Sequence, residues 1–222
     1  LGNLAGGAAG REGAPPMLAG TGQGDVHLVI VMTANRGLCG GFNSNIIRAS
    51  RNLIRELLDR GKVAKVLCVG RKGRDNLRRD FKHLIADSYT ELGRKTVQFA
   101  EAEEVASKIT SMLTAGEFDV ATMVYARFQS AMSQVVTRQQ IIPFPVPESE
   151  SVDDALSVYD YEPSDQEILV ELLPRNLSVQ VFRAMLENGA SFYGSQMTAM
   201  DSATRNAGEM IDKLKTKYNR TR

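Results

Sequence analysis

The chain has few of the residues that build disulfide frameworks and metal sites. Its 222 residues include two cysteines, Cys39 and Cys68, and two histidines, His27 and His83. Two cysteines are too few for a disulfide scaffold and they do not form a CxxC pair, so we expect reduced thiols in a cytosol-like compartment. Both histidines fall in apolar, strand-like surroundings without the spacing of metal ligands, which argues against a metal site.

Long apolar runs and an excess of one sign of charge are also absent. No apolar run approaches the ~20 residues needed to cross a bilayer. With 27 basic and 26 acidic residues the net charge is +1, so no global field favours nucleic acid as a partner. An apolar content of 43% in a chain of this length predicts one sizeable domain with its own core and an extension.

The opening segment, residues 1–24, is rich in glycine, alanine and proline, which is typical of a flexible connector. It has neither the basic start nor the long apolar run of a secretory signal. Because the chain begins with Leu1, we expect a fragment or a processed product, in which residues 1–4 would be the end of a preceding helix.

Residues 25–142 alternate between strand-like and helix-like patterns. Short apolar runs predict strands over residues 26–32, 63–69, 84–86, 120–125 and 134–142. Amphipathic spacing predicts helices between them, over residues 46–58, 71–81 and 102–113. This alternation is typical of an α/β domain with a mostly parallel, Rossmann-like sheet. The last two strands have no helix between them, which predicts an antiparallel edge.

A glycine-rich loop joins the first predicted strand to the first predicted helix, and it consists of Gly37, Leu38, Cys39, Gly40 and Gly41. Asn43 or Ser44 is the expected cap of that helix. Rossmann and P-loop proteins hold phosphate groups at such a place. This loop lacks the Gly-Lys-Ser/Thr ending of a Walker motif, and the second strand does not end in an acidic residue. We therefore expect the glycines to allow a tight turn and close packing, with a nucleotide-binding α/β enzyme as the alternative.

Catalytic groups are not apparent in the sequence. There is no G-x-S-x-G elbow, and no histidine is placed as a base near a serine or cysteine. A basic run is typical of a solvated helix face, and contact with an anionic surface stays open as its second interpretation. Its members are Arg71, Lys72, Arg74, Arg78 and Arg79.

The composition changes after residue 142. Residues 143–163 begin with Pro143, Pro145 and Pro147 and continue with an acidic stretch, which is typical of a loop. Residues 164–222 follow as a helical segment, in which Ser164 would be the N-cap and Pro174 would break or kink the helix.

The last quarter of the chain carries a heptad pattern. Steps of three and four residues separate the members of this seam, which predicts a helix that packs lengthwise against another helix. The seam consists of Ala190, Tyr193, Met197, Met200, Thr204, Ala207, Ile211, Leu214, Tyr218 and Thr221. Asp201 precedes Arg205 by four residues, the favourable order of charges on a helix.

Two other interpretations of this segment stay open. An amphipathic helix that lies on its own domain has the same periodicity, although the seam runs to the last residues without a cap. Asn188 and Gly189 together have the pattern of a helix stop, after which Ser191 would cap a second helix. No other segment has a matching heptad run, so the sequence contains no visible partner helix for the seam.

Two motifs resemble the gamma-subunit family of F-type ATP synthases. The first covers residues 34–45 (ANRGLCGGFNSN), and the second is spread over residues 197–201 (MTAMD), 206–207 (NA) and 218–222 (YNRTR). They occur in the order and at the distance expected for that family, and the resemblance extends over residues 25–222.

The resemblance implies a central rotor shaft without a catalytic site of its own. An N-terminal helix, which this sequence lacks apart from residues 1–4, would form an antiparallel coiled coil with the C-terminal helix inside a ring of alpha and beta subunits. The α/β domain would be the foot outside that ring, on the membrane c-ring and beside the epsilon subunit. Proton flow would turn the c-ring and the foot, and the asymmetric shaft would drive the beta sites through their binding states. ATP or ADP and magnesium would be bound by the alpha and beta subunits.

The same resemblance implies contact residues. Tyr159, Tyr161 and Glu162 match a Tyr-x-Tyr-Glu-Pro loop that contacts the c-ring and the epsilon subunit, and Arg222 matches an arginine that contacts a beta subunit. The seam would face the N-terminal helix. We expect a peripheral protein on the cytoplasmic face of a bacterial inner membrane, or alternatively on the matrix side of the mitochondrial inner membrane. A coiled-coil adaptor is the remaining alternative function.

Overall fold

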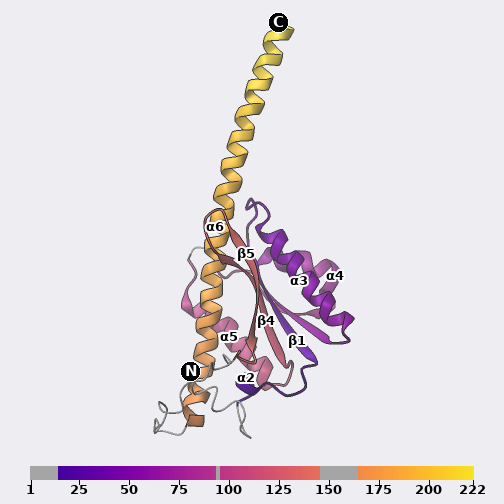
Figure 1. Ribbon diagram of the computed structural model, residues 1–222, viewed down its shortest axis with the longest axis vertical. Helices are drawn as coiled ribbons and strands as arrows, with labels where there is room; N and C mark the ends of the chain where they lie inside the picture. The colour runs from indigo at the N-terminus through magenta and orange to yellow at the C-terminus, as the bar shows by residue number, and fades with distance from the viewer. Residues whose placement is uncertain (1–14, 94–95, 146–164) are drawn as a thin grey trace, which may run out of the picture.

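The computed structural model describes residues 15–93, 96–145 and 165–222, without the side chains of residues 19 and 165–168 (Figure 1). Its elements follow the chain as α2 (Pro16–Ala19), β1 (Val26–Met32), α3 (Phe42–Asp59), β2 (Val63–Val69), α4 (Arg71–Phe81), a 3-10 turn (Lys82–Leu84), β3 (Ile85–Tyr89), α5 (Phe99–Thr114), β4 (Val120–Phe128), β5 (Gln134–Ile142) and α6 (Asp165–Thr221).

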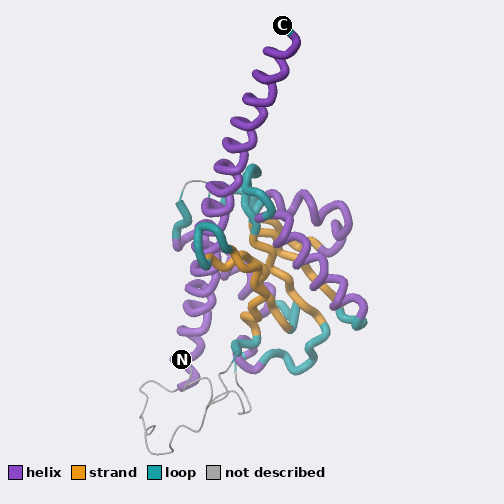
Figure 2. The backbone as a smooth tube through the Cα atoms, turned by 45° about the horizontal axis from the view of Figure 1, so that its top comes forward, coloured by secondary structure: helices purple, strands orange, loops and turns teal. Residues whose placement is uncertain are grey.

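The strands of the described residues form one sheet (Figure 2). Their order in the sheet is β3-β2-β1-β4-β5. β1 pairs in parallel with β2 and β4, β2 pairs in parallel with β3, and β4 pairs with β5 in the antiparallel sense. The predicted fold class is therefore confirmed, including the antiparallel edge and the long C-terminal helix. The continuous apolar runs of β1 and β2 are explained by their central positions, where both faces of a strand are covered.

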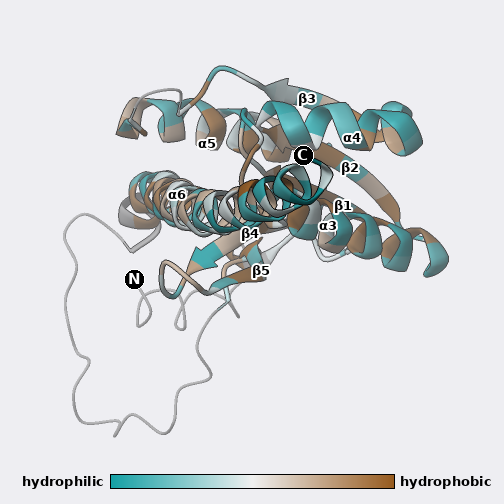
Figure 3. Cartoon of the chain, turned by 90° about the horizontal axis from the view of Figure 1, so that it is seen from above, coloured by the Kyte–Doolittle hydropathy of each residue, from teal (hydrophilic) through white to brown (hydrophobic). Residues whose placement is uncertain are grey.

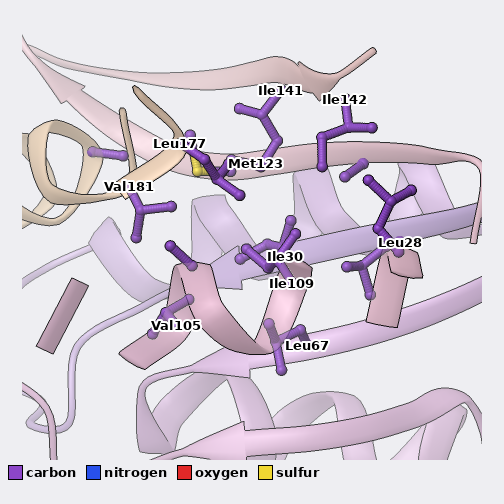
Figure 4. Close-up of a cluster of buried hydrophobic side chains, with 14 of the residues drawn as sticks. Leu28, Ile30, Leu67, Val105, Ile109, Met123, Ile141, Ile142, Leu177 and Val181 are labelled. Atoms are coloured by element: carbon purple, nitrogen blue, oxygen red, sulfur yellow. The ribbon is translucent and has the colours of Figure 1, made fainter. Parts of the chain in front are cut away.

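Helices cover both faces of the sheet (Figure 3). Alternate residues of a strand point to opposite faces. Leu28 and Ile30 of β1 accordingly belong to a core formed with α2, α5 and α6, whereas Val29 and Val31 belong to a core formed with α3 and α4. Figure 4 shows the first core, in which Leu177 from α6 lies among side chains of the sheet and of α5. Burial of each such side chain stabilises the fold by about 1.5–3 kcal/mol.

The helix α6 is the longest element, with 57 residues. At about 1.5 Å per residue it is about 85 Å long. Residues 169–199, which we call the anchored segment, pack on α5 and on the sheet. Residues 201–222, which we call the free segment, are all exposed and extend away from the domain (Figure 1).

The sequence predicts a break or a kink at Pro174, and the break is wrong, because α6 continues through this residue. Ser178 Oγ donates a hydrogen bond to the carbonyl oxygen of Pro174 over 3.1 Å. Leu169, Leu173 and Leu177 are buried on both sides of the proline. This packing outweighs the ~3 kcal/mol that a proline inside a helix costs.

Smaller differences from the predictions lie at the ends of elements. β3 covers Ile85–Tyr89, and His83 lies in the 3-10 turn rather than in a strand. Within the expected connector, α2 buries Met17 and Leu18 in the core. Burial of these two apolar side chains stabilises the short helix, although the residues around it are rich in glycine. The predicted cap at Ser164 and most of the loop 143–163 lie outside the described residues.

Candidate functional site at the junction of helix and sheet

The glycine-rich loop after β1 is held by the side chain of Asn43. Its Oδ1 accepts a hydrogen bond from the amide of Ala34 over 2.9 Å, and its Nδ2 donates to the carbonyl of Arg36 over 3.1 Å. The expected cap at Asn43 or Ser44 is therefore wrong. α3 instead has Gly41 at its N-cap position and no side-chain cap, because the amide group of Asn43 is used to close the loop.

The helix α6 crosses over this loop and touches its backbone. Ser195 Oγ donates a hydrogen bond to the carbonyl oxygen of Cys39 over 2.7 Å. Gly40 has a φ of 53°, which favours glycine, and a Cβ at this position would lie 3.8 Å from Cβ of Ala199. The glycines thus allow a tight turn and close packing, as the first interpretation of the loop predicts.

This crossing lies between β1 and β4, where the strand order reverses. In open α/β sheets, ligands bind in the crevice at such a switch point, beyond the carboxyl ends of the strands. Here α6 occupies that place, since it is bonded both to the loop after β1 and to the end of β4. The arrangement favours the packing interpretation of the glycine loop over nucleotide binding.

Two further side chains of α6 bind the end of β4 at one residue, Ala126. Asn188 Oδ1 accepts a hydrogen bond from the amide of Ala126 over 3.2 Å, and Ser191 Oγ donates to its carbonyl oxygen over 3.0 Å. Both side chains are buried. The prediction of a helix stop at Asn188 and Gly189 with a cap at Ser191 is wrong, because these polar groups satisfy a strand and not a helix end.

Gly194 lets the tip of the β4–β5 hairpin approach the helix. A Cβ at this position would lie 3.0 Å from the carbonyl oxygen of Ala131 and 3.2 Å from its Cα. Both neighbours are backbone atoms, which cannot move aside as a flexible side chain would. Glycine is therefore required for this close contact between helix and hairpin.

Every member of the seam from Ala190 to Thr221 is exposed. Met197 is 58%, Leu214 59% and Tyr218 68% exposed. The seam is therefore not the face by which α6 lies on its own domain, and that interpretation of the pattern is wrong. Within the described residues, nothing covers this apolar face.

A cavity of about 500 Å³ opens beside the start of the seam, with a mostly apolar lining that also includes Asn35, Arg36 and Arg71. Ala190 and Tyr193 line it from α6, Leu92 and Val97 line it from the segment before α5, and Met32 lines it from the end of β1. The cavity thus continues the apolar face of the seam onto the domain.

A basic hollow of about 530 Å³ lies on the other side of the glycine loop, between α3 and α4. Arg48, Arg51, Arg55 and Lys72 line it, and none of the described lining residues is acidic. Lys72 belongs to the basic run predicted from the sequence, so that run contributes to a concave cationic surface.

Comparison with known proteins decides the family of this chain. A family model described as ATP synthase matches residues 2–222. The ATP synthase gamma chain of Rhodospirillum rubrum is 55% identical to this chain, with all of this chain and 77% of the relative covered. The chain belongs to the ATP synthase gamma-chain family. The gamma chain of Parvibaculum lavamentivorans is 54% identical, with 76% of its length covered.

Solved structures share the fold of this gamma-family chain. The central stalk and c-ring structure of the Tetrahymena thermophila mitochondrial ATP synthase matches with a TM-score of 0.66 and 24% identity, covering 91% of this chain and 97% of that chain. A rotor structure of the Euglena gracilis mitochondrial ATP synthase matches with a TM-score of 0.64 and 19% identity, covering 89% and 72%. Membership of the gamma-chain family makes this chain a rotor-stalk subunit of a rotary ATP synthase. Neither the nucleotide-binding enzyme nor the coiled-coil adaptor is favoured.

The contact residues predicted for this gamma-family chain are placed only in part. Tyr159, Tyr161 and Glu162 lie outside the described residues. Arg222 is exposed at the far end of the free segment, where its amide donates to the carbonyl of Tyr218 over 3.1 Å. The seam and Arg222 therefore lie on the same projecting part of the helix.

Burial favours the neutral form of two buried thiols and of one half-buried histidine in this gamma-family chain. Burial raises the pKa of the Cys68 thiol to about 12 and also raises the pKa of the Cys39 thiol. Burial likewise lowers the pKa of His27. The described residues hold no group of three or more histidine, cysteine or acidic side chains suited to a metal ion. No described helix has the length and apolarity needed to cross a membrane.

Sequence reasoning missed three residues of this junction: Asn188, Ser191 and Ser195. A signal for them exists, because steps of three and four residues place polar side chains on one face of a helix. The same spacing describes the seam on another face, and the apolar seam is the stronger of the two patterns. The polar face becomes recognisable only when its partners on β4 and on the glycine loop are known.

Proposed function

We propose that this chain transmits rotation between a membrane c-ring and the catalytic ring of alpha and beta subunits. The observation that carries the proposal is the division of α6, which is bound to the sheet over its anchored segment and projects freely beyond residue 200 (Figure 1). The free segment is about 30 Å long at about 1.5 Å per residue. A rotation of the α/β foot would thus be carried to a place well outside the domain.

The chemistry of ATP belongs to the partners in this proposal. ATP or ADP and magnesium are bound by the alpha and beta subunits, and this chain supplies no catalytic group. The occupied crevice between β1 and β4 supports this assignment. Coupling then depends on unequal interaction of the projecting helix with the different states of the beta sites, because equal interaction would shift no equilibrium.

The seam pairs with an N-terminal helix of the subunit in an antiparallel coiled coil. Its exposed apolar side chains, such as Ile211 and Leu214, support this pairing, and the cavity beside Tyr193 offers room for apolar side chains of the second helix. The chain spans 76–77% of the length of the curated gamma chains that it matches.

The remaining partners follow from the family motifs. Tyr159, Tyr161 and Glu162 contact the c-ring and the epsilon subunit, and Arg222 contacts a beta subunit. The subunit is peripheral on the cytoplasmic face of a bacterial inner membrane. Curated relatives from bacteria such as Rhodospirillum rubrum, at 55% identity, support the bacterial location over the mitochondrial one.

The experiment starts from the natural subunit with an affinity tag, purified from gently solubilised membranes. We expect alpha, beta, epsilon and c subunits to be recovered with it, together with ATP hydrolysis. Ile211→Asp combined with Leu214→Asp should lower ATP-driven proton uptake, because charges would enter the coiled-coil interface. Met210→Asp, at a similarly exposed residue outside the seam, is the control for a new charge on this part of the helix. Recovery of the subunit alone would contradict the proposal, and equal effects of both variants would contradict the pairing along the seam.

A further inference from the structure

Three buried polar side chains of α6 form one row that faces the sheet. Asn188, Ser191 and Ser195 are separated by three and four residues, which places them on one side of the helix. They are 8%, 0% and 7% exposed. All three use their side chains to bind backbone groups of the domain, at 3.2, 3.0 and 2.7 Å. We call these three residues the polar clasp.

The polar clasp takes the place of a missing strand neighbour at the end of β4. β1 pairs with β4 only as far as Val31 opposite Val124. Ala126 therefore lies two residues beyond the last pairing with β1, yet it is buried. A buried backbone amide or carbonyl without a partner is costly. Asn188 and Ser191 supply both partners and thereby extend the hydrogen bonding of the sheet into the helix.

The third member binds a different part of the domain. Ser195 is bonded to the carbonyl of Cys39 in the loop after β1, whereas the other two members are bonded to β4. The clasp therefore joins α6 to β4 and to the loop that follows β1, on the two sides of the switch point. Since hydrogen bonds depend on distance and angle, three of them at two places define both the axial position and the rotational setting of the helix.

The apolar contacts of α6 are less specific in this respect. Leu169, Leu173, Leu177 and Val181 hold the helix against α5 and the sheet. The hydrophobic effect is non-directional and depends on the area removed from water. Such a contact resists separation of the helix from the sheet more than it resists a small turn of the helix about its own axis.

We propose that the polar clasp is the torque-bearing joint of this subunit. Asn188, Ser191 and Ser195 are positioning residues that prevent the shaft from turning relative to the foot when the two ends are loaded in opposite directions. This inference rests on the proposed rotor function. Without the clasp, ATP hydrolysis would still turn the free segment, but part of each turn would be lost as twist at the joint instead of reaching the membrane ring.

The test compares hydrolysis with proton transport in the assembled complex. We would reconstitute complexes containing Asn188→Ala/Ser191→Ala/Ser195→Ala into vesicles, and measure ATP hydrolysis in the uncoupled state and ATP-driven proton uptake. The matched control is Asn176→Ala/Ser178→Ala, which removes the same residue types from the same helix. Hydrogen bonds of these two residues stay within α6, to Gln180 and Pro174.

We expect the triple variant to keep uncoupled hydrolysis within about twofold and to lose severalfold in protons transported per ATP, with the control unchanged. A normal ratio of protons to ATP in the triple variant would overturn the proposal. A parallel loss of hydrolysis and transport would overturn it as well, because that result indicates a role in stability alone. If the triple variant does not assemble, Ser195→Ala is compared with Ser195→Thr, which keeps the hydroxyl and should restore the ratio.

Failure of the rotor function itself would give a different result. In that case the complex with the natural sequence would not transport protons on adding ATP. If only the clasp proposal fails, the natural complex is fully coupled and the clasp variants have the same ratio of protons to ATP as the natural complex.

Discussion

The anchored and free segments of α6 are parts of one helix, but they are held by different forces. In the anchored segment, Leu169, Leu173, Leu177 and Val181 are buried, and the polar clasp is bonded to the sheet. In the free segment every residue is exposed, and the described contacts are local ones within the helix. The difference indicates that tertiary packing maintains the first segment, whereas the second depends on helix propensity and on whatever pairs with it.

The largest contrast is expected from the same substitution in the two segments. Leu177→Ala removes a fully buried side chain and should lower the free energy of unfolding by about 2–5 kcal/mol. Leu214→Ala, at a side chain that is 59% exposed, should change it by less than about 0.5 kcal/mol. Urea unfolding of this chain followed by circular dichroism measures both values. Equal losses would mean that the free segment is also packed.

A second contrast concerns glycine. Gly194→Val would bring side-chain atoms against the backbone of Ala131 and should cost about 1–3 kcal/mol. Gly208→Val, where a Cβ would have no atom within 4 Å, should stay within about 0.5 kcal/mol of the parent chain. Thermal unfolding of the two variants side by side is the measurement. A neutral Gly194→Val would show that the β4–β5 hairpin is not seated on α6.

Low pH should lower the stability of the sheet on which the anchored segment packs. The hydroxyl of Thr21, and then the amides of Val26 and Asp25, donate hydrogen bonds to Asp119 and lower its pKa. Because the folded-state pKa lies below the unfolded value of about 3.9, this stabilisation is present above about pH 4 and is lost as the pH falls through the folded-state pKa.

Urea midpoints measured between pH 7 and pH 3 check this expectation. Asp119→Asn should lower the midpoint at pH 7 and flatten its decrease toward acid. Asp59→Asn, at the exposed end of α3, is the control and should retain the slope of the parent chain. The same slope in Asp119→Asn and in the parent would remove Asp119 as the cause.

The smallest effect is expected in the free segment. Arg205 donates a hydrogen bond to Asp201 over 2.8 Å, and both side chains are exposed. Asp201→Asn should reduce the stability of this helix by about 0.3–0.5 kcal/mol, and 1 M salt should remove the difference. Helicity from circular dichroism at low and high salt measures it. A difference that persists in salt would point to packing instead of charge.

The sequence predicts the sheet well because its signals are local. The continuous apolar runs of β1 and β2 give both strands with their observed ends, and the lack of a helix before β5 gives the antiparallel edge. Helix ends are less accessible to such reasoning. Asn43 has the residue type of an N-cap, but its side chain binds Ala34 and Arg36, so the same chemistry serves a loop.

The polar clasp illustrates the limit more sharply. Asn188 beside a glycine and followed by Ser191 has the local pattern of a helix end, and the actual partner of both side chains is Ala126, more than 60 residues earlier in the chain. Patterns of neighbouring residues cannot predict a hydrogen-bond partner so far away in the sequence. The exposed seam, in contrast, can be predicted from periodicity alone. Its residues are all exposed, so the spacing of apolar residues is sufficient.

The hydrogen bond between Ser195 and Cys39 means that a helix of the same chain lies where other α/β domains bind a ligand. An occupant that belongs to the same chain has a fixed effective concentration, so its occupancy does not depend on how much protein or metabolite is present. A diffusing nucleotide in the same crevice would stabilise the fold in proportion to the logarithm of its concentration. The contact of α6 with the glycine loop is instead formed within the chain and needs no bound molecule.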